Sequence, residues 1–215
     1  MHDFLAGIVS GTIQTFVGHP FDTLKIWQQN KTILKYPTLN FKNLFKGIKI
    51  PIVQNPLLIG TTIYTNSQVY EKYKNIYFSS FCSGVVSSIL YTPLDYLKIN
   101  LQQQNSLNIY KSYNRFNIVM MHEIPANMIF FSSYKILTMY EINNNISGAL
   151  SGFFCSIIIY PINTIKTRMQ SDLELTFYDV IKKKKLYNGI KYSLVRSVLC
   201  GAIGLPIFEK LKSYD

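Results

Sequence analysis

Proline, acid and base side chains stand together at the ends of three apolar stretches. The first set is Pro20, Asp22 and Lys25, and a glutamine, Gln29, follows the lysine four residues later. A proline kinks a helix by removing a backbone donor, which would bring the acid of one stretch near the base of another. The set recurs after shifts of 73 and 68 residues as Pro93, Asp95, Lys98 and Gln102, then as Pro161, Asn163, Lys166 and Gln170. Three copies in one register predict an internal repeat and a gate that ion pairs close.

A pair of small residues, four apart, precedes each of these prolines at a fixed distance. Small residues let helix backbones approach closely in lipid, so the pairs predict three helix contacts. The pairs are Gly7 and Gly11, Ser80 and Gly84, and Gly148 and Gly152.

A second block also repeats, as "FKGIKIPIVQN" from Phe45, "YNRFNIVMMHE" from Tyr113 and "YNGIKYSLVRS" from Tyr187. Each repeat therefore holds two helices joined by a basic loop. The predicted boundaries are 1–75, 76–142 and 143–215 within one integrated transmembrane domain.

Composition places these repeats in a membrane. Only 15% of the 215 residues are charged, against about 25% in soluble domains. Four segments lack charge and are near the roughly 20 residues that a bilayer requires: 4–21, 50–70, 75–94 and 142–165. Two shorter apolar runs, 124–134 and 197–208, reach that length when extended back past Glu123 and Arg196. The sequence predicts six spans.

The net charge of +11 does not indicate nucleic-acid binding. The basic residues gather after the first, third and fifth spans, which marks one membrane face as the basic one. Both termini should lie on the opposite face. The three cysteines are in apolar runs and predict no disulfide framework.

The repeated residues closely resemble the mitochondrial carrier family, whose signature is P-x-[DE]-x-x-[KR]-x-[KR]-x-Q followed by an aromatic-[KR]-G motif. The resemblance covers essentially the whole chain and implies six tilted helices in three pseudo-symmetric repeats around a central cavity, with short matrix-side helices. The chain is short for that family, and Trp27 and Asn100 replace the second base, Asn163 an acid, and Arg115 a glycine.

The resemblance implies two gates. On the matrix side Asp22 should face Lys98, Asp95 should face Lys166, and Asn163 should face Lys25, braced by the three glutamines. On the cytoplasmic side the family pattern [FY]-[DE]-x-x-[KR] is matched by Phe208, Glu209 and Lys212. Tyr70 begins a copy displaced by about one turn, and Lys135 stands where an acid belongs. The alternative is that these charges are merely solvated helix ends.

Substrate contacts in the family lie midway along each even-numbered helix. The corresponding positions here are Gln54 and Asn55, His122 and Glu123, and Arg196 and Ser197. Charged groups at membrane depth are costly and usually functional, although Glu123 and Arg196 could instead form structural pairs and His122 could be a packing residue. An acid and a base facing one cavity suit a zwitterion or an amino-acid-like cation. The segment "HEIPANMIFFSSY" is similar to the carnitine and basic amino acid branch, and a nucleotide substrate stays open.

Cardiolipin is the lipid partner that the resemblance implies, with no other cofactor and no metal. Its phosphates would bind at helix N-termini through Phe45, Lys46 and Gly47, and through Tyr187 and Gly189. The alternative is that each glycine only ends a loop.

The function that follows is exchange of a small charged metabolite by alternating access, in a monomeric, multi-pass protein of the mitochondrial inner membrane. No arrangement of nucleophile, base and orienting acid indicates an enzyme. A carrier-like receptor or scaffold that does not transport is the alternative, since Asn163 and Lys135 break the two networks. Richness in Lys, Asn, Ile and Tyr is typical of AT-rich coding, as in parasites and large viruses, and a viral carrier would act in the host mitochondrion.

Overall fold

The computed structural model describes residues 2–29, 44–45, 48–49, 51–103, 113, 116–171, 176–182 and 186–212. Side chains are described for the same residues except 2–3, 26–29, 95–103, 170–171 and 212. The helices of these parts are α1 (His2–Gln29), α3 (Pro51–Tyr73), α4 (Ile76–Gln103), α5 (Phe116–Met139), α6 (Asn144–Ser171), α7 (Phe177–Lys182) and α8 (Ile190–Lys212). All six apolar segments singled out in the sequence are helical.

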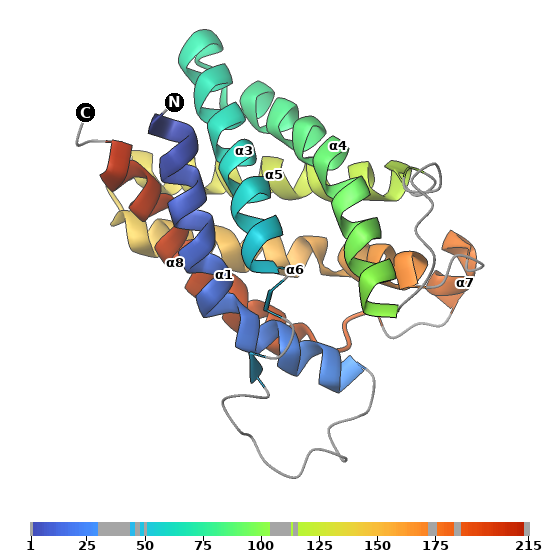
Figure 1. Ribbon diagram of the computed structural model, residues 1–215. Coiled ribbons are helices and arrows are strands. Elements are labelled where there is room, and N and C mark those ends of the chain that lie inside the picture. Colours follow the sequence, from blue (N-terminus) through green and yellow to red (C-terminus); the bar gives the residue numbers. More distant parts are fainter. Residues whose placement is uncertain are drawn as a thin grey trace.

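The six long helices form a closed ring (Figure 1). Each packs against its neighbours in chain order, and α8 closes the ring against α1. The start of α1 and the end of α8 lie at the same end of the bundle (Figure 1). The helix pairs α1 and α3, α4 and α5, and α6 and α8 lie within the three predicted repeats.

The predicted small-residue faces are helix contacts. A Cβ atom on Gly7 of α1 would lie 2.7 Å from Cα of Gly60 on α3, and one on Gly84 of α4 would lie 2.7 Å from Cα of Ile124 on α5. A Cβ atom on Gly148 of α6 would overlap the carbonyl oxygen of Gly201 on α8. The prediction of close helix contact is confirmed, because nothing larger than hydrogen fits at these positions.

One hydrogen bond recurs at equivalent positions of the first and third predicted repeats. The hydroxyl of Thr23 donates to the carbonyl of Leu44 at 2.8 Å, and the hydroxyl of Thr164 donates to the carbonyl of Leu186 at 2.7 Å. Each bond ties the first long helix of a repeat, α1 or α6, to the segment that leads into the second long helix, α3 or α8. Gly189, which precedes α8, has a positive φ of 86°, a conformation that favours glycine.

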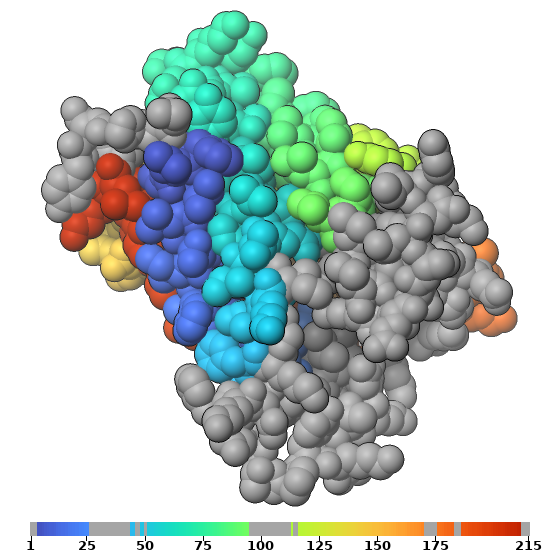
Figure 2. All heavy atoms as spheres, in the orientation of Figure 1, coloured from blue at the N-terminus to red at the C-terminus, as the bar shows by residue number. Residues whose placement is uncertain are grey.

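The outward faces of the helices are apolar while polar side chains point inward. On α1 the exposed large side chains are Leu5, Val9, Ile13 and Phe16, and this helix lies beside α3 on the face seen in Figure 2. Buried positions are instead held by hydroxyls, among them seven serines that have no exposed surface on α4 and α6: Ser79, Ser80, Ser83, Ser87, Ser88, Ser147 and Ser151. An apolar exterior over a polar interior is typical of a helix bundle surrounded by lipid.

Among the described residues, one helix qualifies as a membrane span from its length and composition alone. It is α6 over Asn144–Met169, with a hydropathy of 1.5. Several of the other helices present polar or charged side chains to the interior, which lowers their mean hydropathy. The six spans remain a prediction.

Candidate functional site

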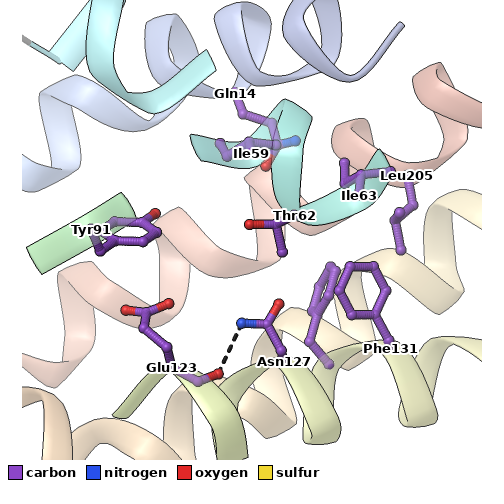
Figure 3. A pocket seen from close by; sticks show the side chains of 10 residues that line it. Gln14, Ile59, Thr62, Ile63, Tyr91, Glu123, Asn127, Phe131 and Leu205 are labelled. Atoms are coloured by element: carbon purple, nitrogen blue, oxygen red, sulfur yellow. Dashed lines mark hydrogen bonds between the residues drawn. The ribbon is translucent and has the colours of Figure 1, made fainter. Parts of the chain in front are cut away.

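A central cavity of about 170 Å³ lies inside the helix ring (Figure 3). Its only ionisable carboxylate among the described residues is that of Glu123, and most of its wall is apolar. The cavity is lined by Gln14, Ile59, Thr62, Ile63, Tyr91, Glu123, Asn127, Phe130, Phe131 and Leu205. These residues come from five of the six long helices, so the ring as a whole encloses the space.

Three lining residues separate this cavity from a second one. Ile63, Phe131 and Leu205 line both cavities, belong to one buried cluster and are 5–6% exposed. They stand nine residues after the predicted substrate contacts Gln54, His122 and Arg196, and so hold equivalent positions in the three repeats. We call these three residues the apolar ring. Since one side chain comes from each predicted repeat, the ring closes the central cavity on the side of the second cavity.

Glu123 anchors a buried charge cluster at the central cavity. Its Oε1 lies 2.8 Å from Nδ1 of His122 and 3.0 Å from Nζ of Lys166. The lysine ammonium also lies 5.0 Å from the centroid of the Tyr91 ring. Asn127 donates to the backbone carbonyl of Glu123 at 2.8 Å (Figure 3). Buried charges are stable only when paired, and here α6 supplies the cation and α5 the anion.

A second ion pair joins α1 to α8. Nε of Arg196 lies 2.8 Å from Oδ1 of Asp22, and both side chains are about one-third exposed. Each of the two ion pairs therefore joins a predicted substrate contact, Glu123 or Arg196, to a predicted gate residue, Lys166 or Asp22. In the first pair the predicted substrate contact is the acid and the gate residue is the base, and in the second pair the roles are reversed.

Curated relatives and a family profile match this chain. The profile described as "Mitochondrial carrier protein" matches residues 138–214. The chain is 24% identical to "Mitochondrial substrate carrier family protein S" of Dictyostelium discoideum, over 97% of this chain and 95% of that protein. It is 23% identical to "Mitochondrial ornithine transporter 1" of Schizosaccharomyces pombe, over 96% of this chain and 90% of that protein. The chain is similar to members of the mitochondrial carrier family.

A third relative is the "Mitochondrial basic amino acids transporter" of Homo sapiens, 25% identical over 79% of this chain and 72% of that protein. The alignment with the Dictyostelium protein runs over 276 positions, although this chain has 215 residues. The relative therefore carries insertions that this chain lacks, while the six long helices are all present.

The other predicted substrate contacts lie on α3 and α8. Gln54 is buried on α3 and Asn55 is half-buried beside it. The hydroxyls of Ser156 on α6 and Ser197 on α8 are hydrogen-bonded to each other. Their roles in binding a solute remain predictions.

Much of the predicted matrix gate lies outside the described residues. This applies to the side chains of Gln29, Asp95, Lys98, Gln102 and Gln170, and to the lipid positions Lys46 and Gly47. The expected pairs of Asp22 with Lys98 and of Asp95 with Lys166 stay predictions. Of the described members of those pairs, Asp22 contacts Arg196 and Lys166 contacts Glu123.

Lys25 lies beside α6, where its predicted partner Asn163 is found. Its ammonium is 5.5 Å from the ring centroid of Tyr160, one turn before Asn163. We expect Asn163→Asp to stabilise the protein by roughly 0.5–1 kcal/mol, because a carboxylate would replace an amide near this ammonium. The check is the melting temperature in detergent with cardiolipin. If Lys25→Ala does not cancel the gain, the gate assignment for this repeat is wrong.

The second cavity, of about 310 Å³, lies beyond the apolar ring and holds the predicted cytoplasmic gate. Glu209 lines it and accepts a hydrogen bond from Asn144 at 2.8 Å. Lys135, which stands where the family has an acid, places its ammonium 5.1 Å from the centroid of the Tyr70 ring. The side chain of Lys212 lies outside the described residues.

Sequence reasoning missed four polar residues of the central cavity, namely Gln14, Thr62, Tyr91 and Asn127. Asn127 stands four residues after Glu123, so helical spacing could have placed it on the same face. Gln14 and Tyr91 have no such signal, because neither lies at a repeated motif position.

Proposed function

We propose that this carrier moves a small amino-acid-like solute with a cationic group across the mitochondrial inner membrane. The observation that carries the proposal is the carboxylate of Glu123 on the wall of the closed central cavity, 7% exposed. A buried carboxylate at membrane depth needs a cationic partner, and a cavity beside it can admit one that arrives with a solute.

The relatives support an amino acid as the solute. Two of them are named as transporters of ornithine and of basic amino acids. Such solutes carry an ammonium group and a carboxylate. Glu123 on the cavity wall is a partner for the ammonium, and Arg196, which pairs with Asp22 outside the described lining of this cavity, is the partner we propose for the carboxylate. Carnitine-like cations share this chemistry, whereas a nucleotide would bring several negative charges to a cavity lined by Glu123.

Alternating access follows from the arrangement of the two closures. The apolar ring separates the central cavity from the second cavity. The predicted matrix-side charges lie on the first long helix of each repeat, namely α1, α4 and α6. Opening one side while the other is closed would expose the central cavity to each face in turn. The six spans, three repeats, bound cardiolipin, monomeric state and inner-membrane location belong to this proposal.

A receptor or scaffold that does not transport is the second candidate. The observation that favours it is Lys135, which stacks on Tyr70 where the family pattern has an acid. At this position a cation–π contact would take the place of the ion pair that closes the cytoplasmic gate in the family pattern.

Uptake by liposomes separates the two candidates. The full chain would be reconstituted with cardiolipin, and uptake of labelled L-arginine, L-ornithine, glycine and carnitine measured with and without the same solute inside. Saturable uptake of an amino acid supports transport. Absence of uptake for all four, by protein that remains folded, would favour the receptor.

Arg196→Ala tests the site within this proposal. We expect uptake to fall at least about 100-fold. Such a fall corresponds to the loss of roughly 2.7 kcal/mol of transition-state stabilisation, which one charged substrate contact can supply. Folding should survive, because the partner carboxylate of Asp22 is 38% exposed and water can reach it. The matched control is Lys191→Ala, an exposed residue of α8. Wild-type uptake by Arg196→Ala would show that the arginine is only structural.

A further inference from the structure

Lys166 and Glu123 form the most buried ion pair among the described side chains, and the glutamate of this pair lines the solute cavity of the proposed carrier. The exposed fractions are 7% for the lysine side chain and 9% for the glutamate side chain. Glu123 lines the cavity, as does Tyr91, over whose ring the lysine ammonium lies. The ammonium therefore has a carboxylate and an aromatic face as partners, the same two groups that bind a cationic ligand.

We propose that Lys166 is a tethered competitor, whose ammonium occupies the place at Glu123 that the cationic group of the solute takes during transport. This inference rests on the proposed function. It assigns Lys166 a part in binding affinity and specificity, besides the matrix gate that the sequence predicts for it.

The energetics of burial make this competition obligatory. Removing the lysine without a replacement would leave Glu123 as a buried, poorly compensated charge, which is strongly unfavourable. A solute ammonium or guanidinium supplies the missing charge, so the lysine can leave only as the solute arrives. A neutral solute of the same size cannot release Lys166, and the site thereby discriminates by charge.

Release of Lys166 also bears on the matrix gate. The side chain of Asp95, its predicted gate partner, lies outside the described residues, so their contact stays a prediction. An ammonium that the solute displaces from Glu123 would be available to that predicted partner, so occupancy of the cavity would change the charges at the matrix gate. The pair of Asp22 and Arg196 has the same arrangement with the charges exchanged. Its gate residue is a carboxylate, and it lies 2.8 Å from a basic predicted solute contact.

The test measures binding of L-arginine to the full chain in detergent with cardiolipin, by isothermal titration calorimetry. Lys166→Met should bind L-arginine at least about tenfold more tightly than wild type, because apparent affinity is reduced by the fraction of protein whose site is blocked. Lys166→Gln serves as a second neutral variant in case the methionine variant does not fold. Lys166→Arg keeps a tethered cation and should bind as weakly as wild type, within about threefold.

The matched control is Lys191→Met, which removes an exposed ammonium of α8. This residue has no part in the cavity or the gates, so we expect the dissociation constant to change less than about twofold. Unchanged or weaker binding by both neutral Lys166 variants would overturn the inference while leaving transport intact. If wild type neither takes up nor binds L-arginine and the Lys166 variants do not bind it either, both the solute class and the inference fail.

Discussion

Glu123→Gln should abolish transport and destabilise the folded protein by about 3–5 kcal/mol, the usual effect of breaking a buried pair by removing one partner. The change keeps the shape of the side chain but leaves the ammonium of Lys166 buried without its carboxylate 3.0 Å away. His122 loses the same acceptor, at 2.8 Å. Melting temperature in detergent reports the stability, and amino acid uptake by liposomes reports the transport.

The double variant Glu123→Gln with Lys166→Met separates the two effects. Removing both charges should restore most of the lost stability, because no unpaired charge stays buried. Uptake should stay lost, since the solute then has no carboxylate to bind. A double variant that transports would show that Glu123 serves the fold alone. A single variant as stable as wild type would show that the pair is not buried in the working protein.

Gly148→Ala should cost about 3 kcal/mol of folding stability, the upper part of the range for overpacking, because the added methyl meets backbone that cannot rotate away. Its Cβ would overlap the carbonyl oxygen of Gly201, so α6 and α8 must separate along their contact. The expected result is a large fall in melting temperature and a reduced yield of folded protein.

Gly204→Ala is the matched control on α8. Its Cβ would also overlap a neighbour, but that neighbour is the terminal amide of Gln14, a flexible side chain that can move. We expect a loss below about 1 kcal/mol. Equal losses for the two variants would contradict the view that backbone contact between α6 and α8 limits the size of residue 148.

The sequence predicted the helices and their close contacts because those features depend on local pattern. An apolar run of sufficient length forms a helix in lipid wherever it stands, and a pair of small residues four apart always lies on one face. Gly148 and Gly152 could thus be assigned to a helix contact. The repeats then placed Glu123 and Arg196 at equivalent depth, since equal spacing along helices gives equal height in the bundle.

Only the tertiary structure decided which charges meet. The resemblance to the mitochondrial carrier family implied pairs of Lys166 with Asp95 and of Asp22 with Lys98, and these stay predictions because Asp95 and Lys98 lie outside the described side chains. The structure adds contacts of Lys166 with Glu123 and of Asp22 with Arg196, which are 43 and 174 positions away along the chain. A long, flexible lysine can reach more than one carboxylate, and helix tilt and rotation set which ones lie within its reach. Those angles come from the packing of all six helices together, so no short stretch of sequence encodes the partner.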